Sequence, residues 1–148
     1  MDLIKLVQIL IFSFILSVQD IKKREISNWV ILNAITFMLV TDIVFYTNYL
    51  IWNFLSVVFM GAMFFALNRK SKIGKGDCFY AIYIALSLTF PLFCFAAIFL
   101  SCVFAGIFYI ILYAVKKNNL QNYRISFIPF MSAGLVILCT VNLLLLNH

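Results

Sequence analysis

Two of the five carboxylic acids in this chain stand where a pair of them could act together. Asp20 follows the first long apolar stretch, and Asp77 precedes the fourth, 57 residues later. Ionisable side chains at membrane depth are costly and are functional candidates by default. Two carboxylates that lie close together cannot easily both ionise, so they share a proton. Such a pair can activate water and protonate a carbonyl oxygen, which is general acid–base hydrolysis of a peptide bond without a covalent intermediate.

The other three acids have simpler explanations. Asp2 is close to the first residue and is expected to be solvated, and Glu25 follows the basic run 22–24, which gives it partners in a solvated loop. Asp42 lies 13 residues beyond Trp29, or about 20 Å along a helix. We therefore expect Asp42 at the opposite membrane face, as an interfacial residue.

Two glycines before Asp77 make this carboxylate the more specific signal. The sequence reads Gly74-Lys75-Gly76-Asp77, and glycine permits both a positive φ and close approach of other groups to the backbone. Gly74 and Gly76 are therefore expected to let an extended substrate pass near the carboxylate. The alternative is that Asp20 and Asp77 only balance the basic loops and cap helices.

The elements that must position these acids are membrane helices. Hydrophobic residues make up 66% of the chain and charged residues 11%, against roughly 25% charged residues in soluble domains. A membrane helix needs roughly 20 apolar residues. The sequence predicts an all-α fold, a bundle of about six transmembrane helices in a single membrane domain over residues 1–148. The expected spans are approximately 3–18, 29–46, 50–67, 77–90, 91–115 and 127–145.

The longest apolar run predicts a turn. Residues 78–115 carry no charge and would form a helix about 57 Å long, nearly twice the hydrocarbon core. The run must therefore fold back, and Thr89-Phe90-Pro91 is the expected turn because proline cannot donate to a helix that it interrupts. The fourth helix is then short, so Asp77 is expected below the membrane surface.

The basic residues predict the orientation. Ten of the eleven lysines and arginines lie in three short loops, which is the pattern of loops that stay in the cytoplasm. These residues are Lys22, Lys23, Arg24, Arg69, Lys70, Lys72, Lys75, Lys116, Lys117 and Arg124. Only Lys5 falls on the other side. The clustering argues for a multi-pass protein of the cytoplasmic membrane with a lipid bilayer as partner, and against a nucleic-acid partner.

No metal or cofactor is expected. The four cysteines, Cys78, Cys94, Cys102 and Cys139, lie in or beside apolar stretches and form no CxxC pair. The simplest interpretation is that each is a small buried hydrophobic residue. Neither a zinc site nor a disulfide framework follows from this spacing.

Two segments carry a family resemblance. Asp20-Ile-Lys-Lys-Arg-Glu-Ile-Ser-Asn28 resembles the prepilin peptidase pattern of an Asp, a basic residue and then Ile-Pro-Asn, and Gly74-Lys-Gly-Asp77 matches the second motif of that family. Ile128-Pro129-Phe130 is weakly similar to a Pro-Phe segment of the family. The resemblance implies a GxGD-type membrane aspartic peptidase with Asp20 and Asp77 as catalytic pair. Gly74, Gly76 and Asn28 would support the site; Asn28 is expected to cap the second helix or, less favoured, to orient Asp20.

The sequence also departs from the family. Ser27 stands where the family usually has proline, and Phe79 and Tyr80 replace the Lys-Leu that commonly follows GxGD. Longer, bifunctional members carry a cytoplasmic segment with a tetracysteine zinc site and also methylate the new N-terminus. The first cytoplasmic loop here is about nine residues long and has no cysteine, so the chain resembles a short form without the zinc-binding domain. This departure speaks against methyl transfer.

The resulting prediction is a membrane aspartic endopeptidase. By resemblance, it cleaves the leader peptides of type IV prepilin-like or pseudopilin-like substrates, single-span proteins, at the cytoplasmic membrane face. Two alternatives stay open: a non-enzymatic membrane subunit of a pilus or secretion system, and a small transporter that couples to protons through Asp20 and Asp77.

Overall fold

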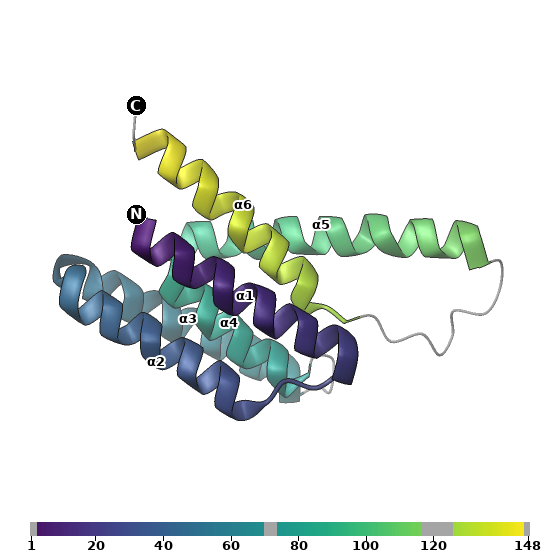
Figure 1. The fold of residues 1–148 in the computed structure, drawn as a ribbon, viewed down its shortest axis with the longest axis horizontal. Helices are drawn as coiled ribbons and strands as arrows, with labels where there is room; N and C mark the ends of the chain where they lie inside the picture. The colour runs from purple at the N-terminus through teal and green to yellow at the C-terminus, as the bar shows by residue number, and fades with distance from the viewer. Residues whose placement is uncertain (1–2, 70–73, 117–125, 147–148) are drawn as a thin grey trace.

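The computed structural model describes residues 3–69, 74–116 and 126–146, which form helices joined by short connections, with no strand among them (Figure 1). The α-helices are α1 (Leu3–Lys23), α2 (Asn28–Phe45), α3 (Leu50–Arg69), α4 (Lys75–Leu88), α5 (Pro91–Lys116) and α6 (Ile128–Leu146). A short 3-10 helix, η1 (Thr47–Tyr49), precedes α3. The expected all-α fold is confirmed.

The lengths and composition of the helices fit a polytopic membrane protein. Within the described residues, α1, α2, η1 joined to α3, and α5 are each long and apolar enough to cross a membrane. The apolar part of α6 is shorter and covers Ile128–Leu144. Helix α4 has only 14 residues, which gives a length of about 21 Å against a hydrocarbon core of about 30 Å.

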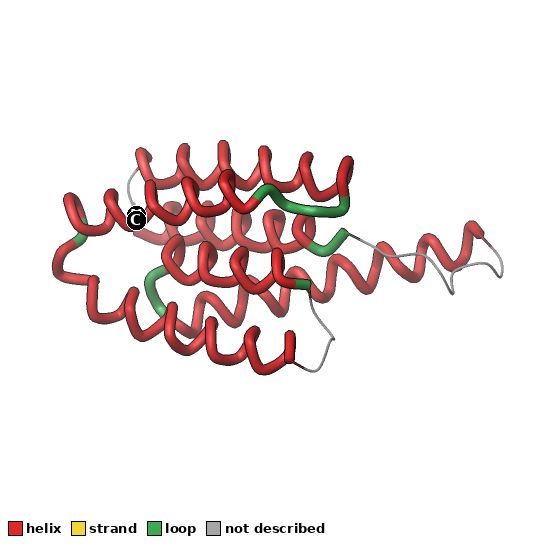
Figure 2. The backbone as a smooth tube through the Cα atoms, turned by 90° about the horizontal axis from the view of Figure 1, so that it is seen from below, coloured by secondary structure: helices red, strands yellow, loops and turns green. Residues whose placement is uncertain are grey.

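Helix α4 is the centre of the bundle. It contacts α2, α3, α5 and α6, and nine of its fourteen residues are buried, including Tyr80 and Tyr83. The helices run roughly along one direction in Figure 2, and Figure 1 shows α5 at an angle to α1 and α6. A helix surrounded by protein needs no lipid-spanning length, because its neighbours shield its ends from the hydrocarbon.

The predicted turn between α4 and α5 is confirmed. Helix α4 ends at Leu88, and α5 begins at Pro91. Thr89 caps α4 with a φ of 65°, which is unusual for a β-branched residue. The Thr89 carbonyl accepts a hydrogen bond of 2.6 Å from Ser56 Oγ on α3, so the turn is tied to the neighbouring helix.

Helices α5 and α6 approach closely at a glycine. A Cβ atom added to Gly134 would lie 2.5 Å from the Ala97 carbonyl oxygen and 2.5 Å from Ser101 Oγ. Only a residue without a side chain fits there, as at many close helix crossings in membranes. This crossing holds α6 on the part of α5 that lies in the bundle, whereas the C-terminal end of α5 extends beyond the other helices (Figure 1).

Helix α1 is longer than the predicted first span. It continues to Lys23, so Asp20 lies inside the last helical turn and not at the helix end. Some residues on which sequence predictions rest lie outside the described residues: Asp2, Lys70, Lys72, Lys117 and Arg124.

Candidate active site

Asp20 and Asp77 line the same pocket. The pocket has a volume of about 340 Å³ and lies where α1 ends and where α4 and α6 begin. Its lining residues are Asp20, Lys23, Arg24, Glu25, Asp77, Ser126 and Phe127. The chain thus brings together two acids that are 57 residues apart in the sequence, from helices that run in opposite directions.

Asp20 is held by the beginning of α6. The side chain is buried, and its Oδ2 accepts a hydrogen bond of 3.2 Å from the backbone N–H of Ile128, the first residue of α6. Ser126 Oγ donates to the Asp20 backbone carbonyl at 3.1 Å. The first N–H groups of a helix have no partner within the helix and carry partial positive charge. The Ile128 N–H therefore offsets part of the cost of burying an ionised Asp20.

Asp77 sits in the first turn of α4 and bonds back to the residue that precedes the helix. Its Oδ2 accepts a hydrogen bond of 3.3 Å from the backbone N–H of Gly74, which occupies the N-cap position in an extended conformation. Gly74 has no side chain with which to return the bond, so the carboxylate alone caps the helix. The side chain of Asp77 is half-buried.

Each carboxylate keeps one oxygen free for chemistry. Within the described residues, Oδ1 of Asp20 and Oδ1 of Asp77 have no hydrogen-bond partner. Since the two groups line one pocket, ionisation of either makes ionisation of the other less favourable. A pocket with one ionised and one protonated carboxyl group can hold a water molecule against a carbonyl group.

The glycines work by close approach and not by unusual backbone conformation. No glycine in the described residues has a positive φ, and the passage of an extended substrate beside Gly74 and Gly76 stays a prediction. Gly76 lies within α4, and a Cβ there would stand 3.0 Å from Cδ1 of Ile26. A Cβ at Gly74 would stand 3.3 Å from Asp77 Oδ2. Gly76 thus lets the loop after α1 pack directly against the helix that carries Asp77.

Asn28 does not have the predicted capping role. Ser27 occupies the N-cap position of α2, without a side-chain hydrogen bond, and Asn28 is the first helical residue, with an exposed side chain. Asn28 is also not among the residues that line the pocket. A role in orienting Asp20 stays a prediction.

Sequence reasoning missed the contribution of α6. Ser126, Phe127 and the Ile128 N–H come from the segment that begins this helix. A signal was present in Ile128-Pro129-Phe130, because proline is favoured in the first turn of a helix. That signal predicts where α6 begins, but it does not predict which side chain accepts hydrogen bonds from the first N–H groups of the helix.

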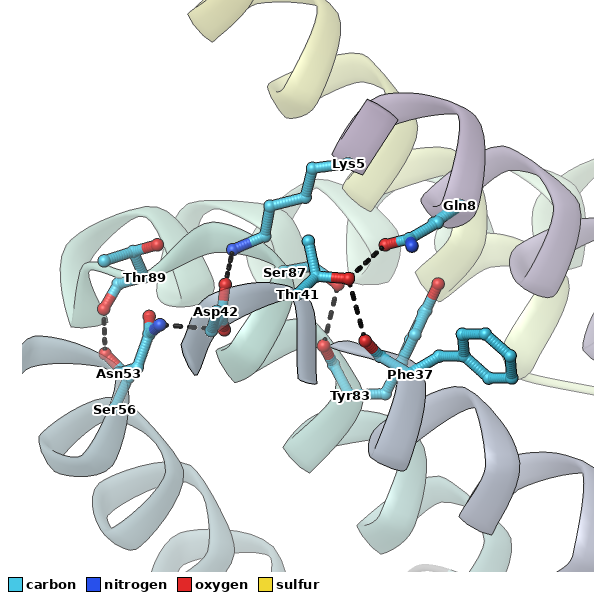
Figure 3. A network of polar contacts seen from close by, with 10 residues as sticks. All are labelled: Lys5, Gln8, Phe37, Thr41, Asp42, Asn53, Ser56, Tyr83, Ser87 and Thr89. Atoms are coloured by element: carbon cyan, nitrogen blue, oxygen red, sulfur yellow. Dashed lines mark hydrogen bonds and ion pairs between the residues drawn. The ribbon is translucent and has the colours of Figure 1, made fainter. Parts of the chain in front are cut away.

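Asp42 lies at the end of the bundle away from the pocket, as predicted, but it is enclosed by other helices. Asp42 is fully buried, and its Oδ1 accepts a 2.6 Å bond from Lys5 Nζ, which is itself 3% exposed (Figure 3). Asn53 Nδ2 donates to Asp42 Oδ2 at 2.8 Å. Helices α1, α2 and α3 all contribute to this polar cluster, at the end of the bundle away from the pocket. In a buried site a lysine is stable only beside such an anion.

No metal site accompanies the two acids in the described part of the chain. Among residues 3–69, 74–116 and 126–146, no three His, Cys, Asp or Glu side chains come together in a way that could hold a metal ion. Of the four cysteines, Cys78, Cys94 and Cys139 are buried and Cys102 is exposed, and none forms a disulfide.

Comparison with known proteins gives one match. The model of the type IV leader peptidase family matches residues 7–111, which is more than two thirds of the chain and includes both Asp20 and Asp77. The match ends before α6, so the Ile128 N–H lies outside it. Searches of curated proteins and of solved structures each found no match.

Proposed function

Because the chain belongs to the type IV leader peptidase family, we propose that it is a membrane aspartic endopeptidase that uses Asp20 and Asp77 as its catalytic pair. The substrates are type IV prepilin-like or pseudopilin-like single-span proteins, which it cuts at the cytoplasmic membrane face. The observation that carries the proposal is the shared pocket, in which the Oδ1 of each carboxyl group has no hydrogen-bond partner among the described residues.

The reaction needs only the two acids and a water molecule. The ionised carboxylate takes a proton from water as the water oxygen attacks the carbonyl carbon of the peptide bond. The protonated carboxyl group gives its proton to the carbonyl oxygen, which forms a tetrahedral diol. The first carboxyl group then gives its proton to the leaving nitrogen, while the second carboxylate takes a proton from one hydroxyl of the diol. The C–N bond breaks, which gives a new carboxyl terminus and a free amine and restores the starting state of both acids.

The position of the pocket indicates where a substrate would be cut. The pocket lies at the ends of helices, so it reaches the junction where a charged leader meets a hydrophobic helix more easily than the middle of that helix. By family resemblance, the residue before the cut is glycine. The loop between α1 and α2 contains only residues 24–27 and no cysteine, so we propose no methyl transfer.

The charge distribution supports a cytoplasmic pocket. Among the described residues, Lys22, Lys23, Arg24, Arg69 and Lys75 lie at the pocket end of the helices. Lys5, the one described cation at the other end, is paired with Asp42 and contributes no free loop charge. The positive-inside pattern is therefore sharper than the sequence alone indicates.

A cleavage assay tests the proposal. Asp20→Asn and Asp77→Asn should each abolish processing of a co-expressed single-span protein whose short basic leader ends in glycine. Both variants should elute from size-exclusion chromatography like the parent chain. Thr36→Val is the control, because Thr36 is exposed and its hydroxyl bonds only the Leu32 carbonyl of its own helix. Parent-like processing by either Asn variant would refute the catalytic pair and favour a scaffold or transporter.

A further inference from the structure

A chain of buried hydroxyl groups joins the three helices that build the pocket. Tyr80 on α4 donates to Ser13 Oγ on α1 at 3.0 Å, and its hydroxyl lies 2.6 Å from Ser132 Oγ on α6. Ser17 Oγ, also on α1, donates to Ser132 at 2.8 Å. A hydroxyl has one proton to give. Tyr80 gives its proton to Ser13, and Ser132 can donate either to Tyr80 or to the Ser13 backbone carbonyl, which lies 3.5 Å away.

On each of these helices, the hydroxyl lies about one turn away from a group of the candidate site, which is a carboxyl group on α1 and α4 and a backbone N–H on α6. Ser17 precedes Asp20 by three residues, Tyr80 follows Asp77 by three, and Ser132 follows Ile128 by four. Residues three or four apart lie on the same face of a helix. The hydroxyl chain is therefore a layer directly below the two carboxylates and the N–H that bonds Asp20.

This layer can set the relative position of the helices. Tyr80 and Ser13 are almost fully buried, and Ser132 is 7% exposed. Apolar contacts between membrane helices tolerate sliding, because lipid tails are as apolar as the side chains. A buried hydroxyl without a partner is costly, so sliding or rotating one helix would break the chain.

We propose that Tyr80 is a positioning residue, whose hydroxyl fixes the relative axial placement of α1, α4 and α6 and thereby the separation of Asp20 and Asp77. Tyr80 does not touch the substrate. It acts through the bonds to Ser13 and Ser132. The inference rests on the proposed function where activity is measured, but the positioning itself is a property of the fold.

The kinetic test uses Tyr80→Phe, which keeps the ring and removes the hydroxyl, and Ser132→Ala. The matched control is Ser87→Ala, since Ser87 is a buried α4 residue whose hydroxyl bonds only the Tyr83 carbonyl of its own helix. Both network variants should lower kcat by about tenfold to a hundredfold, because small misplacements of catalytic groups are that costly, with KM within about twofold. The spacing between the two limbs of the pH–rate profile should also change, since it reports the interaction of the two carboxyl groups.

A second readout does not depend on activity. In a chain without the native cysteines, Asp20→Cys and Asp77→Cys are introduced together and treated with bifunctional thiol reagents of graded length. Tyr80→Phe and Ser132→Ala should broaden the range of lengths that give a cross-link, and Ser87→Ala should not. If the parent chain cleaves no substrate, the proposed function fails while the cross-linking still tests the positioning.

The proposal is overturned if both network variants match Ser87→Ala in kcat and in cross-linking range. Should Tyr80→Phe not fold, Ser17→Ala removes one bond at the half-buried edge of the layer. That variant is expected to change kcat and the cross-linking range in the same direction but less. Parent-like values for Ser17→Ala and Ser132→Ala would equally overturn the proposal.

Discussion

The ion pair between Lys5 and Asp42 should dominate the stability of the end of the bundle away from the pocket. The pair has a 2.6 Å contact, and its members are 3% and 0% exposed. Asp42→Asn leaves the Lys5 ammonium group buried without an anion, and Lys5→Met leaves the carboxylate with only the Asn53 amide. Combining Lys5→Met with Asp42→Asn removes both charges and keeps an amide at position 42 that can accept the Asn53 bond.

The magnitudes follow from the burial. Removing one partner of a buried pair costs about 3–5 kcal/mol, because the other charge stays desolvated, whereas removing both charges is often close to neutral. Each single variant should therefore lose about 3–5 kcal/mol of the free energy of unfolding. The double variant should stay within about 1 kcal/mol of the parent chain. Since folded proteins are stable by only about 5–15 kcal/mol, a single variant loses a large share.

Denaturant titration in mild detergent, monitored by tryptophan fluorescence, measures the free energy of unfolding of each variant. Trp52 lies beside Asn53 in α3, with its ring 5.7 Å from that of Phe90, and so reports directly on this end of the bundle. Single variants within about 1 kcal/mol of the parent, or a double variant as unstable as the singles, would refute the reasoning. Asp42→Asn is therefore unsuitable as an activity-neutral control for the cleavage assay, because it lowers the free energy of unfolding.

Three further predictions concern packing, the pocket and orientation. Gly134→Ala should lower the free energy of unfolding by about 1–3 kcal/mol by forcing α5 and α6 apart, measured by the same titration. Gly76→Val should lower kcat in the cleavage assay by about tenfold or more, since its side chain would displace Ile26 beside the pocket. In a chain without the native cysteines, Lys22→Cys should react with an impermeant thiol reagent only from the cytoplasmic side and Asn48→Cys only from outside.

The glycine predictions have controls within the chain. A Cβ at Gly106 or at Gly61 would meet nothing within 4 Å, so Gly106→Ala and Gly61→Val should leave both stability and cleavage close to those of the parent. Equal losses for Gly134→Ala and Gly106→Ala would show that the close approach of α5 and α6 does not matter. Reaction of the Lys22→Cys thiol from outside would reverse the proposed orientation.

The sequence predicts the helices, and it predicts that Asp20 and Asp77 lie at the same end of the bundle. Both predictions follow from where each apolar segment begins and ends. Hydropathy locates apolar spans, and proline locates the turn at Pro91, because each acts within one segment. Asp20 and Asp77 then reach the same end of the bundle simply because successive helices alternate in direction. That argument needs only the number of helices between them.

The contacts across helices could not be predicted in this way. Whether Lys5 meets Asp42, or the Ile128 N–H meets Asp20, depends on the rotation of each helix and on its axial position relative to its neighbours. Neither is fixed by hydropathy in helices that are apolar on all sides. Asn28 misses the N-cap position of α2 by one residue, because Ser27 occupies that position, without a side-chain hydrogen bond.

The buried face of α1 shows which signal was available after all. Its buried residues are Lys5, Ile9, Ser13, Leu16 and Asp20, at intervals of three or four, so they lie on one side of the helix. Three of these five residues are polar, whereas most of the other residues of α1 are apolar. In a membrane the polar residues of a helix turn towards protein because lipid offers them no partner, so their period marks the inner face. Helix α1 thus makes polar contacts at both ends and in its middle, through Lys5, Ser13 and Asp20, and these contacts hold Asp20 in the pocket that Asp77 also lines.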